Sequence, residues 1–447
     1  MKGSFWPAKT AIWRNRTQGP KDTLPRRSSM TPLEREIRAM CLGARKAARA
    51  LAPRSTEEKN AGLEAVARAI EDARAEILAA NAADVAGAKE RGQTAALVDR
   101  LTLDETRLAG VAASVREIAA LADPVGEVVS RATRPNGLRI TRVRVPLGVI
   151  AMIFESRPNV TIEASALALK AGNAIVLRGG SEAKRSNEAL AAAVARALEK
   201  TGLPRDAAQV VASTDRDAVR VLVQQSELVD LAIPRGGEAL IRFVTENARV
   251  PVVQHYKGVC HLFLDAGADV DEAVRIVMNA KMQRPGVCNA LECLLVDAAD
   301  ASRLLPPVAK ALLAAGCELR AGPRARALVP DAKAASEGDF GCEFLDTILA
   351  VKVVDGLDAA LAHVAEFGSG HTEAILTPNT AHAERWRREV DAACVVVNAS
   401  TRFHDGGELG LGAEIGIATS RLHWRGPMGL ESLTTMKWLV DGEGQVR

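Results

Sequence analysis

Cys288 has the surroundings that a nucleophilic thiol requires. It follows a Pro-Gly pair in the stretch RPGVCNALECLLV (284–296), between a helical pattern at 271–282 and an apolar run at 291–297 that is typical of a strand. A loop in this position can open a thiol to a cleft and place backbone amides beside it, as attack on a carbonyl carbon needs. On the local sequence alone a small core residue remains the alternative, and it is our interpretation of Cys293 within the strand.

The histidines and cysteines show no metal-binding spacing. The 7 histidines form no H-E-x-x-H motif and no pair among the 7 cysteines has zinc-finger spacing, so we expect no metal site. His371 and Asn398 flank strand patterns, where a satisfied polar residue at a strand end is the commoner explanation. Cysteines scattered without paired spacing predict reduced thiols in a cytoplasmic protein.

Two glycine-rich turns could hold phosphate. Gly179 and Gly180 in VLRGGSEAKRSN follow a strand pattern and open a helical one, and Gly236 and Gly237 in LAIPRGGEALIR repeat the arrangement. Backbone amides at the start of a helix bind phosphate groups. Neither turn fits G-x-G-x-x-G, so ordinary left-handed turns are an equally good interpretation.

These candidates lie on alternating strand and helix patterns, which predict parallel, doubly wound sheets. The patterns occur as two sets, and two α/β layers in one chain make the cleft between domains a natural ligand site. The first set of expected strands is 148–154, 173–179, 208–213, 228–234 and 250–254, and the second is 260–265, 291–297, 347–354, 372–377 and 394–398.

Helical patterns precede the first set of strands. One at 55–92 begins with a capping-box pair, and another covers 104–123. Residues 139–147 then alternate apolar side chains with Arg and Thr, which predicts an exposed ribbon leading into a buried strand. The glycine-rich stretch at 400–440 is expected to hold loops and a terminal strand or two.

Composition and charge bound the class of protein. The chain has 447 residues, 48% hydrophobic and 25% charged, as soluble globular proteins do, and its net charge is +3. Residues 1–29 hold seven basic side chains and one acidic one, which leaves the rest at about −3 and predicts no nucleic-acid partner. No apolar run approaches the ~18 residues that span a bilayer, so we expect no membrane association.

The basic segment at 1–29 has the composition of a transit peptide. Our interpretation is instead a disordered or upstream-initiated extension, because Met30 opens the first amphipathic segment.

Six stretches carry a resemblance to a known family. In order they are VPLGVIAMIFESRPNVT, GNAIVLRGGSEA, IPRGGEALIRFV, RPGVCNALECLLV, FGSGHTEAILT and VNASTRFHDGGELGLGAEIGI. Together they resemble the glutamate-5-semialdehyde dehydrogenase family, also called gamma-glutamyl phosphate reductases, a branch of the aldehyde dehydrogenase superfamily. The resemblance covers about residues 31–440 and implies an α/β, aldehyde-dehydrogenase-like fold of two doubly wound parallel domains with a small oligomerisation ribbon.

The resemblance implies a reaction in proline biosynthesis, in which NADPH reduces L-glutamyl 5-phosphate to glutamate 5-semialdehyde and phosphate. Cys288 falls on the superfamily's nucleophile and would form a thioester. Asn159 matches an oxyanion donor that works with the backbone amide of Cys288. Phosphate is a good leaving group, so positioning for hydride transfer is the greater demand.

The resemblance also assigns the cofactor residues. Arg178 and Ser181 fall near the adenosine ribose, where a basic and a small neutral side chain suit NADPH. The turn of Gly179 and Gly180 belongs to the same site. Gly236 and Gly237 match a second turn near the pyrophosphate, and Glu343 matches the glutamate that holds the nicotinamide ribose.

Two alternatives remain. Hydrolytic aldehyde dehydrogenases carry a glutamate base upstream of the cysteine, whereas VVQHYKGVCHLFLD here has no carboxylate before Asp265. A hydrolysing enzyme is therefore favoured only if His255 supplies a base. A non-catalytic member of the fold would be expected to have lost Cys288 or Asn159, and both are present.

Substrate contacts and assembly are the last expectations. The substrate's carboxylate, ammonium and phosphate groups should meet hydroxyl and Arg donors, and the resemblance points to Arg157, Arg284, Ser400, Thr401 and Arg402, although the arginines could be surface ion pairs. A homodimer or tetramer and an association with glutamate 5-kinase are implied as well. The expected domains are 1–29, a basic extension; 30–126 with 145–254, cofactor binding; 255–400, catalytic; 127–144 with 430–447, oligomerisation; and 401–429, substrate-side and cofactor-domain loops.

Overall fold

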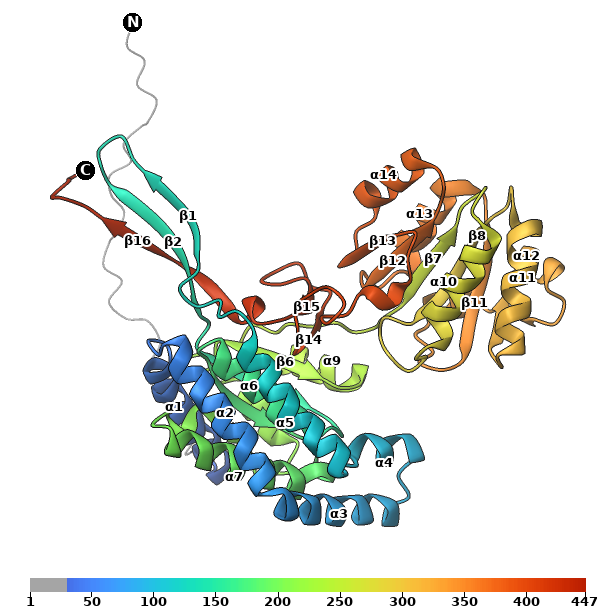
Figure 1. The fold of residues 1–447 in the computed structure, drawn as a ribbon. Coiled ribbons are helices and arrows are strands. Elements are labelled where there is room, and N and C mark those ends of the chain that lie inside the picture. The colour runs from blue at the N-terminus through green and yellow to red at the C-terminus, as the bar shows by residue number, and fades with distance from the viewer. Residues whose placement is uncertain (1–29) are drawn as a thin grey trace, which may run out of the picture.

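The structure of the chain, a computed structural model, describes residues 30–447. Two bodies with parallel sheets and one antiparallel ribbon make up this part of the chain (Figure 1). The extension expected at 1–29 lies outside the described residues. Among the residues that the structure describes, no helix is long and apolar enough to cross a membrane.

Within residues 30–447, five helices come before the first strand. The helix expected at 55–92 is interrupted at Ala73, where φ and ψ of −87° and 11° leave the helical region. The interruption lets the two halves follow different partners, because the first packs on α5 and α7 and the second on α7 and a short 3₁₀ turn. The helices are α1 (Pro32–Leu51), α2 (Thr56–Asp72), α3 (Arg74–Glu90), α4 (Ala95–Leu101) and α5 (Glu105–Ala120).

The first body contains a parallel sheet of four strands in the order β5-β4-β3-β6. Every position of β3 is buried, as in a strand with both faces covered. The strand expected at 250–254 is wrong: only an isolated bridge from Ala232 to Val252 forms, because Pro251 has no N–H for a ladder. The elements are β3 (Val149–Phe154), α6 (Asn159–Lys170), β4 (Ala174–Arg178), α7 (Lys184–Lys200), β5 (Ala208–Val210), α8 (Asp217–Val223), β6 (Leu231–Arg235) and α9 (Glu238–Asn247).

The second body contains seven parallel strands in the order β10-β9-β11-β8-β7-β12-β13. Sequence reasoning missed β9 and the edge strand β10, because both are short and carry charged side chains at Glu318, Arg320 and Lys333. The strands are β7 (Cys260–Leu264), β8 (Leu291–Asp297), β9 (Glu318–Ala321), β10 (Lys333–Ala334), β11 (Ile348–Val354), β12 (Thr372–Leu376) and β13 (Cys394–Val397), and the helices are α10 (Val270–Met282), α11 (Ala301–Ala314), α12 (Pro323–Leu328), α13 (Gly356–Phe367) and α14 (Thr380–Glu389).

An antiparallel ribbon projects from the first body, on the side away from the second (Figure 1). It joins β1 (Val128–Thr133) and β2 (Arg139–Pro146) to β16 (Thr434–Asp441), so that the last strand of the chain pairs with the segment between α5 and β3. Trp438 is 60% and Val440 58% exposed on it, and the Arg142 guanidinium lies 5.3 Å from the centroid of the Trp438 ring, so β16 presents largely exposed apolar side chains.

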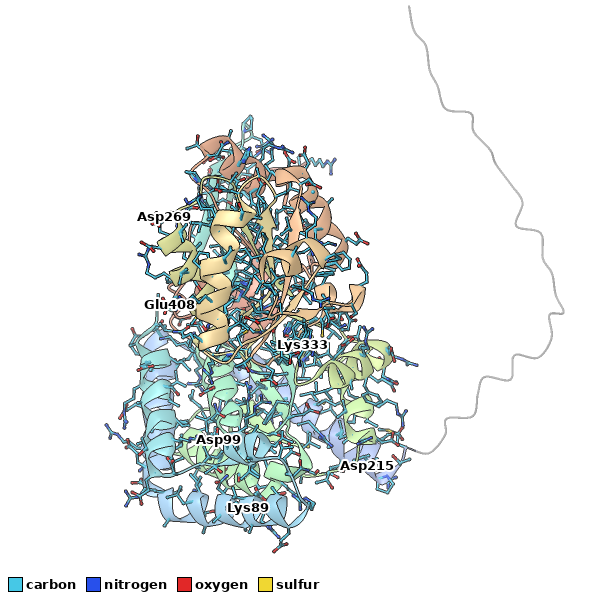
Figure 2. The ribbon with its side chains drawn as sticks, turned by 90° about the vertical axis from the view of Figure 1, so that its right-hand side faces the viewer. Lys89, Asp99, Asp215, Asp269, Lys333 and Glu408 are labelled. Carbon is cyan, nitrogen blue, oxygen red and sulfur yellow. The ribbon has the colours of Figure 1, made fainter. Side chains whose placement is uncertain are left out.

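The two bodies lie one above the other when the molecule is seen from the side (Figure 2). Asp99 and Asp215 belong to the lower body, and Asp269 and Lys333 to the upper one. After β13 the chain returns to the first body through β14 (Gly416–Ala418) and β15 (Gly426–Met428), and Ile415, Ala418 and Met428 pack into the core of that body.

Candidate active site

The loop that carries Cys288 is fixed by its neighbours. Loops that precede β7, β8 and β12 meet because these strands are adjacent and parallel, and Cys288 lies before β8. A side chain on Gly258 would place its Cβ 2.1 Å from the carbonyl oxygen of Cys288, so glycine is required there. The same oxygen accepts a hydrogen bond from Sγ of Cys260 at 3.2 Å, while Thr401 Oγ1 donates to the carbonyl oxygen of Asn289 at 2.8 Å. The thiol is thus held on a rigid loop.

The Cys288 thiol is half-buried and protonated at neutral pH. Burial raises its pKa to about 12, with further contributions from the carboxylates of Glu414 and Glu343, while Arg235 acts in the opposite direction. A nucleophilic attack by this sulfur therefore requires a group that takes up its proton.

Histidines surround the thiol. Sγ of Cys288 and one ring nitrogen each of His255 and His371 lie within 4.8 Å of one another. The ring of His404 lies behind that of His371, with 4.8 Å between the ring centroids. Sequence reasoning treated His371 as a satisfied residue at a strand end and missed this position. Strand order was the signal that could have found it. His371 lies in the loop before β12, and this loop reaches the same edge of the sheet as the Cys288 loop before β8.

Arginines make the space near the thiol attractive for an anion. The pKa of Arg157 is lowered by burial and then by Arg235, Arg100 and Arg284, which means that these cations lie close enough to repel one another. Sequence reasoning named Arg157 and Arg284 but missed Arg235, whose Nη1 donates to the carbonyl oxygen of Ile415 at 2.8 Å. A phosphate group placed among these guanidinium groups would relieve their mutual repulsion.

The other predicted substrate and oxyanion residues have protein partners. Asn159 begins α6, and its Nδ2 donates to Glu163 Oε1 at 3.0 Å. Ser400 is buried, and its Oγ accepts a hydrogen bond from the backbone N–H of Arg402. The Arg402 guanidinium donates from Nε to Gln283 at 3.0 Å, and burial lowers its pKa.

A cavity of about 410 Å³ lies at the ends of β3 and β4, where the first glycine turn predicted a cofactor. Arg178 forms one wall, and its guanidinium donates to the carbonyl oxygens of Gly179, Thr214 and Asp215, while its buried Nε has no partner in the described chain. Gly180, Ser181 and Arg216 also line this cavity, together with Ala88, Gln93, Leu97, Leu101, Ile153, Phe154, Glu155, Ser156, Glu182, Thr214 and Leu240.

Glu155 joins the second glycine turn to the same region. The backbone N–H of Gly237 donates to Glu155 Oε2 at 3.1 Å, and a Cβ on Gly236 would lie 2.4 Å from that oxygen. Glu343, the predicted ribose ligand, is half-buried on the opposite body, and burial raises its pKa. The two turns thus follow β4 and β6, the strands on either side of β3, at the same edge of the sheet.

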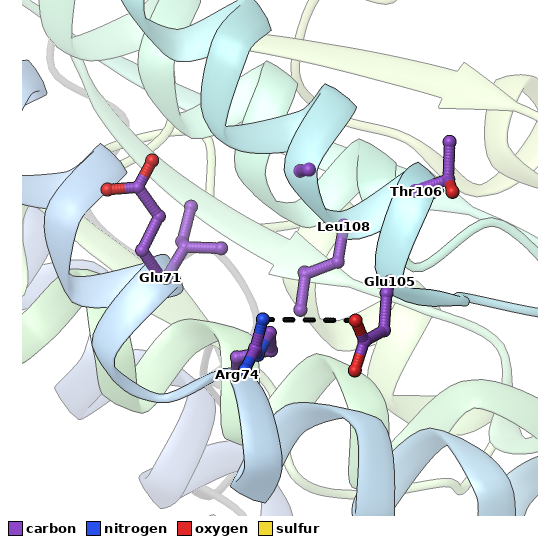
Figure 3. A pocket seen from close by; sticks show the side chains of 7 residues that line it. Glu71, Arg74, Glu105, Thr106 and Leu108 are labelled. Carbon is purple, nitrogen blue, oxygen red and sulfur yellow. Dashed lines mark ion pairs between the residues drawn. The ribbon is translucent and has the colours of Figure 1, made fainter.

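A second cavity, of about 460 Å³, lies between the end of α2 and the start of α5 (Figure 3). An ion pair of 3.8 Å between Arg74 and Glu105 crosses its mouth. None of the predicted site residues lines it, and its walls are Ile70, Glu71, Arg74, Glu105, Thr106, Leu108 and Ala109.

Fold and site define an aldehyde dehydrogenase. The model of the aldehyde dehydrogenase family matches residues 30–326. Enzymes of this family use nicotinamide cofactors. The sequence predicted three features of this site. They are two α/β bodies with parallel sheets, a cysteine loop at the edge of the second sheet, and glycine turns at the ends of strands in the first.

Within this class the chain belongs to the gamma-glutamyl phosphate reductase family of oxidoreductases. It is 60% identical over 420 residues to the gamma-glutamyl phosphate reductase of Sorangium cellulosum, covering 93% of this chain and 98% of that protein. It is 57% identical to the enzyme of Anaeromyxobacter sp. strain K, over 94% of this chain and all of that one. The crystal structure of gamma-glutamyl phosphate reductase from Thermotoga maritima superposes with a TM-score of 0.91 at 47% identity, covering 92% of this chain and 100% of that one.

Proposed function

We propose that this chain reduces L-glutamyl 5-phosphate to L-glutamate 5-semialdehyde and phosphate with NADPH, as a step of proline biosynthesis, through a thioester on Cys288. The observation that carries the proposal is the position of the Cys288 thiol on a rigid loop whose surroundings include Arg157, Arg235 and Arg284. An acyl phosphate brings both a carbonyl carbon for the sulfur and an anion for the guanidinium groups.

Different residues of the chain bind the phosphate, stabilise the oxyanion and bind the substrate's carboxylate in the acylation step. Arg157 and Arg284 hold the phosphate, which leaves with the electron pair of the bond that breaks as sulfur attacks. The backbone N–H of Cys288 and the Nδ2 of Asn159 stabilise the oxyanion, and Asn159 exchanges its Glu163 partner for the substrate to do so. Arg402 is the ligand that we propose for the substrate's carboxylate, while Ser400 and Thr401 shape the turn that carries it.

The cavity beside Arg178 fits the adenosine end of NADPH. The guanidinium of Arg178, with its unpartnered buried Nε, and the exposed side chain of Arg216 supply positive charge to this cavity. Ser181 adds no carboxylate that would repel a 2′-phosphate. Gly236 and Gly237 face the pyrophosphate and Glu343 the nicotinamide ribose. NADPH bound in this way supplies the hydride that converts the thioester to the aldehyde.

The domain roles follow from this assignment. Residues 30–126 and 145–254 bind the cofactor, 255–400 carry the nucleophile, and 401–429 return to close the site. We propose that the segments 127–144 and 430–447 pair between subunits in a dimer or tetramer, since β16 leaves Trp438 exposed. The enzyme is proposed to work in the cytoplasm and to receive its labile substrate from glutamate 5-kinase.

A hydrolysing aldehyde dehydrogenase is the second candidate function, and one observation favours it. Glu414 and Glu343 lie close enough to Cys288 to raise the pKa of its thiol, and sequence reasoning named only Glu343 of these two carboxylates, as a ribose ligand. Burial raises the pKa of Glu414, and it accepts a hydrogen bond from the backbone N–H of Gly406 at 3.0 Å. A raised pKa suits a carboxylate that activates water, and the single accepted hydrogen bond leaves the other oxygen of Glu414 free to do so.

The test is the reverse reaction, measured as NADP reduction by glutamate 5-semialdehyde with and without inorganic phosphate. We expect a rate that requires phosphate, because phosphate then resolves the thioester. Cys288→Ala should abolish the rate while leaving NADPH binding by fluorescence unchanged. Equal rates without phosphate would instead assign water activation to this site, with Glu414, Glu343 and His255 as the groups to replace.

A further inference from the structure

His371 keeps one ring nitrogen free of partners, and its ring lies near the Cys288 thiol. The side chain is 0% exposed, and its Nδ1 lies 2.7 Å from Thr372 Oγ1. Its Nε2 has no hydrogen-bond partner within residues 30–447. A buried imidazole nitrogen without a partner is costly, so such an atom calls for an explanation. The thiol, within 4.8 Å of one nitrogen of this ring and of one of His255, is the reactive group at hand.

Thr372 controls the tautomer of His371. Its Oγ1 lies 2.7 Å from His371 Nδ1 and also 2.7 Å from His404 Nδ1. A hydroxyl group carries a single hydrogen, so it donates to one ring and accepts from the other. When Thr372 donates to His404, His371 Nδ1–H donates to Thr372. The Nε2 of His371 is then a bare lone pair that can accept a proton.

His255 does not have this support. It is half-buried, and no hydrogen bond fixes its ring among the contacts of the described chain, whereas His371 is held through Thr372 and His404. Burial and Arg235 lower the pKa of His255, and burial with His404 and His255 lowers that of His371, so both rings are neutral before reaction. The further groups that face this pair are Cys260, 3.7 Å from His371 Nδ1, and Arg235, Glu343 and Glu414 around the thiol.

We propose that His371 takes up the thiol proton of Cys288 at Nε2 as sulfur attacks the acyl carbon, and that Thr372 and His404 are positioning residues for it. The inference rests on the proposed function, since it requires Cys288 to be the nucleophile. The carbon–sulfur bond forms, the bond from the acyl carbon to the phosphate oxygen breaks, and its electron pair leaves on phosphate, which takes a proton from water. When sulfur is expelled as thiolate in the later step, His371 returns the proton to it.

The test is the rate of Cys288 alkylation by iodoacetamide in the full chain, followed by peptide mass from about pH 6 to pH 10. His371→Gln preserves polarity but cannot take the proton, so we expect alkylation to be slower by roughly 10²-fold near neutral pH. The deficit should shrink as pH rises, because hydroxide then removes the proton. His255→Gln should change the rate little, and His382→Gln, remote from the thiol, serves as the matched control.

A structural role would give a different result, since a displaced loop would slow alkylation by the same factor at every pH. That pattern, an unchanged rate in His371→Gln, or a loss confined to His255→Gln would overturn the proposal. Thr372→Val leaves His371 in place and removes the hydroxyl that sets its tautomer. Thr372→Val should reproduce part of the pH-dependent loss of alkylation rate. If His371→Gln does not fold, the result for Thr372→Val tests the proposal in its place.

The same samples separate this inference from the proposed function. Reductase turnover is measured after complete alkylation of Cys288. If turnover survives, Cys288 is not the nucleophile and both proposals fail. If turnover is lost while His371→Gln and Thr372→Val are alkylated as fast as the unaltered chain, the reductase mechanism stands and only the role of His371 fails.

Discussion

Thr401 donates a hydrogen bond from Oγ1 to the carbonyl oxygen of Asn289, 2.8 Å away, and so ties the residue after the nucleophile to a segment 112 positions further along the chain. Asn289 extends the connection, because its Nδ2 donates to the carbonyl oxygen of His404 at 3.0 Å. Thr401 is fully buried, and its hydroxyl is used by the loop. Its contribution to the site is therefore the placement of Cys288.

Thr401→Val tests this contribution at nearly constant volume. The carbonyl oxygen of Asn289 loses its donor, so we expect the free energy of unfolding to fall by about 1–3 kcal/mol. Displacement of the thiol should lower kcat roughly tenfold with the KM for NADPH unchanged. Steady-state kinetics and urea unfolding check both. A higher KM for glutamyl phosphate at unchanged kcat would make Thr401 a substrate ligand instead.

Gly258→Ala should damage the site from the other side of the loop. The added Cβ would lie 2.1 Å from a backbone oxygen, that of Cys288, and backbone cannot rotate away as a side chain can. We expect the loop to shift by a substantial fraction of an ångström and kcat to fall roughly 10²-fold. Gly110→Ala is the matched control, because nothing lies within 4 Å of its added Cβ. Equal activity of the two variants would show that the Cys288 loop accommodates the added Cβ without displacing the thiol.

The periodicity of apolar residues predicted most of the helices and strands. It failed where a single residue or the packing of neighbouring elements decides whether a helix or strand continues. The buried strands β3 and β8 were visible as apolar runs, whereas Pro251 reduced an expected strand to one bridge and Ala73 divided an expected helix. The site shows the same limit. The Pro-Gly loop around Cys288 indicates a nucleophile from local sequence. The proximity of His371 to the Cys288 thiol depends on the order of strands in the sheet, which local sequence does not encode.

Arg216 is expected to decide the preference for NADPH. The guanidinium of Arg178 is occupied with backbone carbonyls, whereas Arg216 is exposed at the edge of the same cavity. Arg216→Ala should raise the KM for NADPH about tenfold and leave that for NADH unchanged, since only the 2′-phosphate is affected. Arg220→Ala on the same helix is the control, because Arg220 is paired with Asp217.

Ser181→Glu addresses the same specificity from the opposite direction. A carboxylate at this place in the cavity would repel a 2′-phosphate and could accept hydrogen bonds from a free ribose, so the ratio of kcat/KM for NADPH over NADH should fall. Ser181→Gln, of similar size and without charge, separates repulsion from crowding. An unchanged ratio in Ser181→Glu would mean that the adenosine end binds elsewhere.

His363 should make the protein less stable in acid. Burial, then His261 and Lys352, lower the pKa of this histidine from 6.5 to about 3, so the folded chain excludes a proton that the unfolded chain binds. Stability from this group is therefore fully present above pH 6.5 and is lost as pH falls toward 3. The slope is at most about 1.4 kcal/mol per pH unit.

The measurement is urea unfolding of the second body's tryptophan signal from pH 4 to pH 7 for the unaltered chain and His363→Gln. Trp386 is buried in that body near Phe263, which makes it a suitable reporter. The variant is expected to be less stable at pH 7, because its side chain no longer packs against Phe367, and to lose stability less steeply toward pH 4. His261, whose pKa is raised to about 10, titrates outside this range and leaves the comparison clear. Parallel pH profiles would show that His363 is protonated in the folded chain.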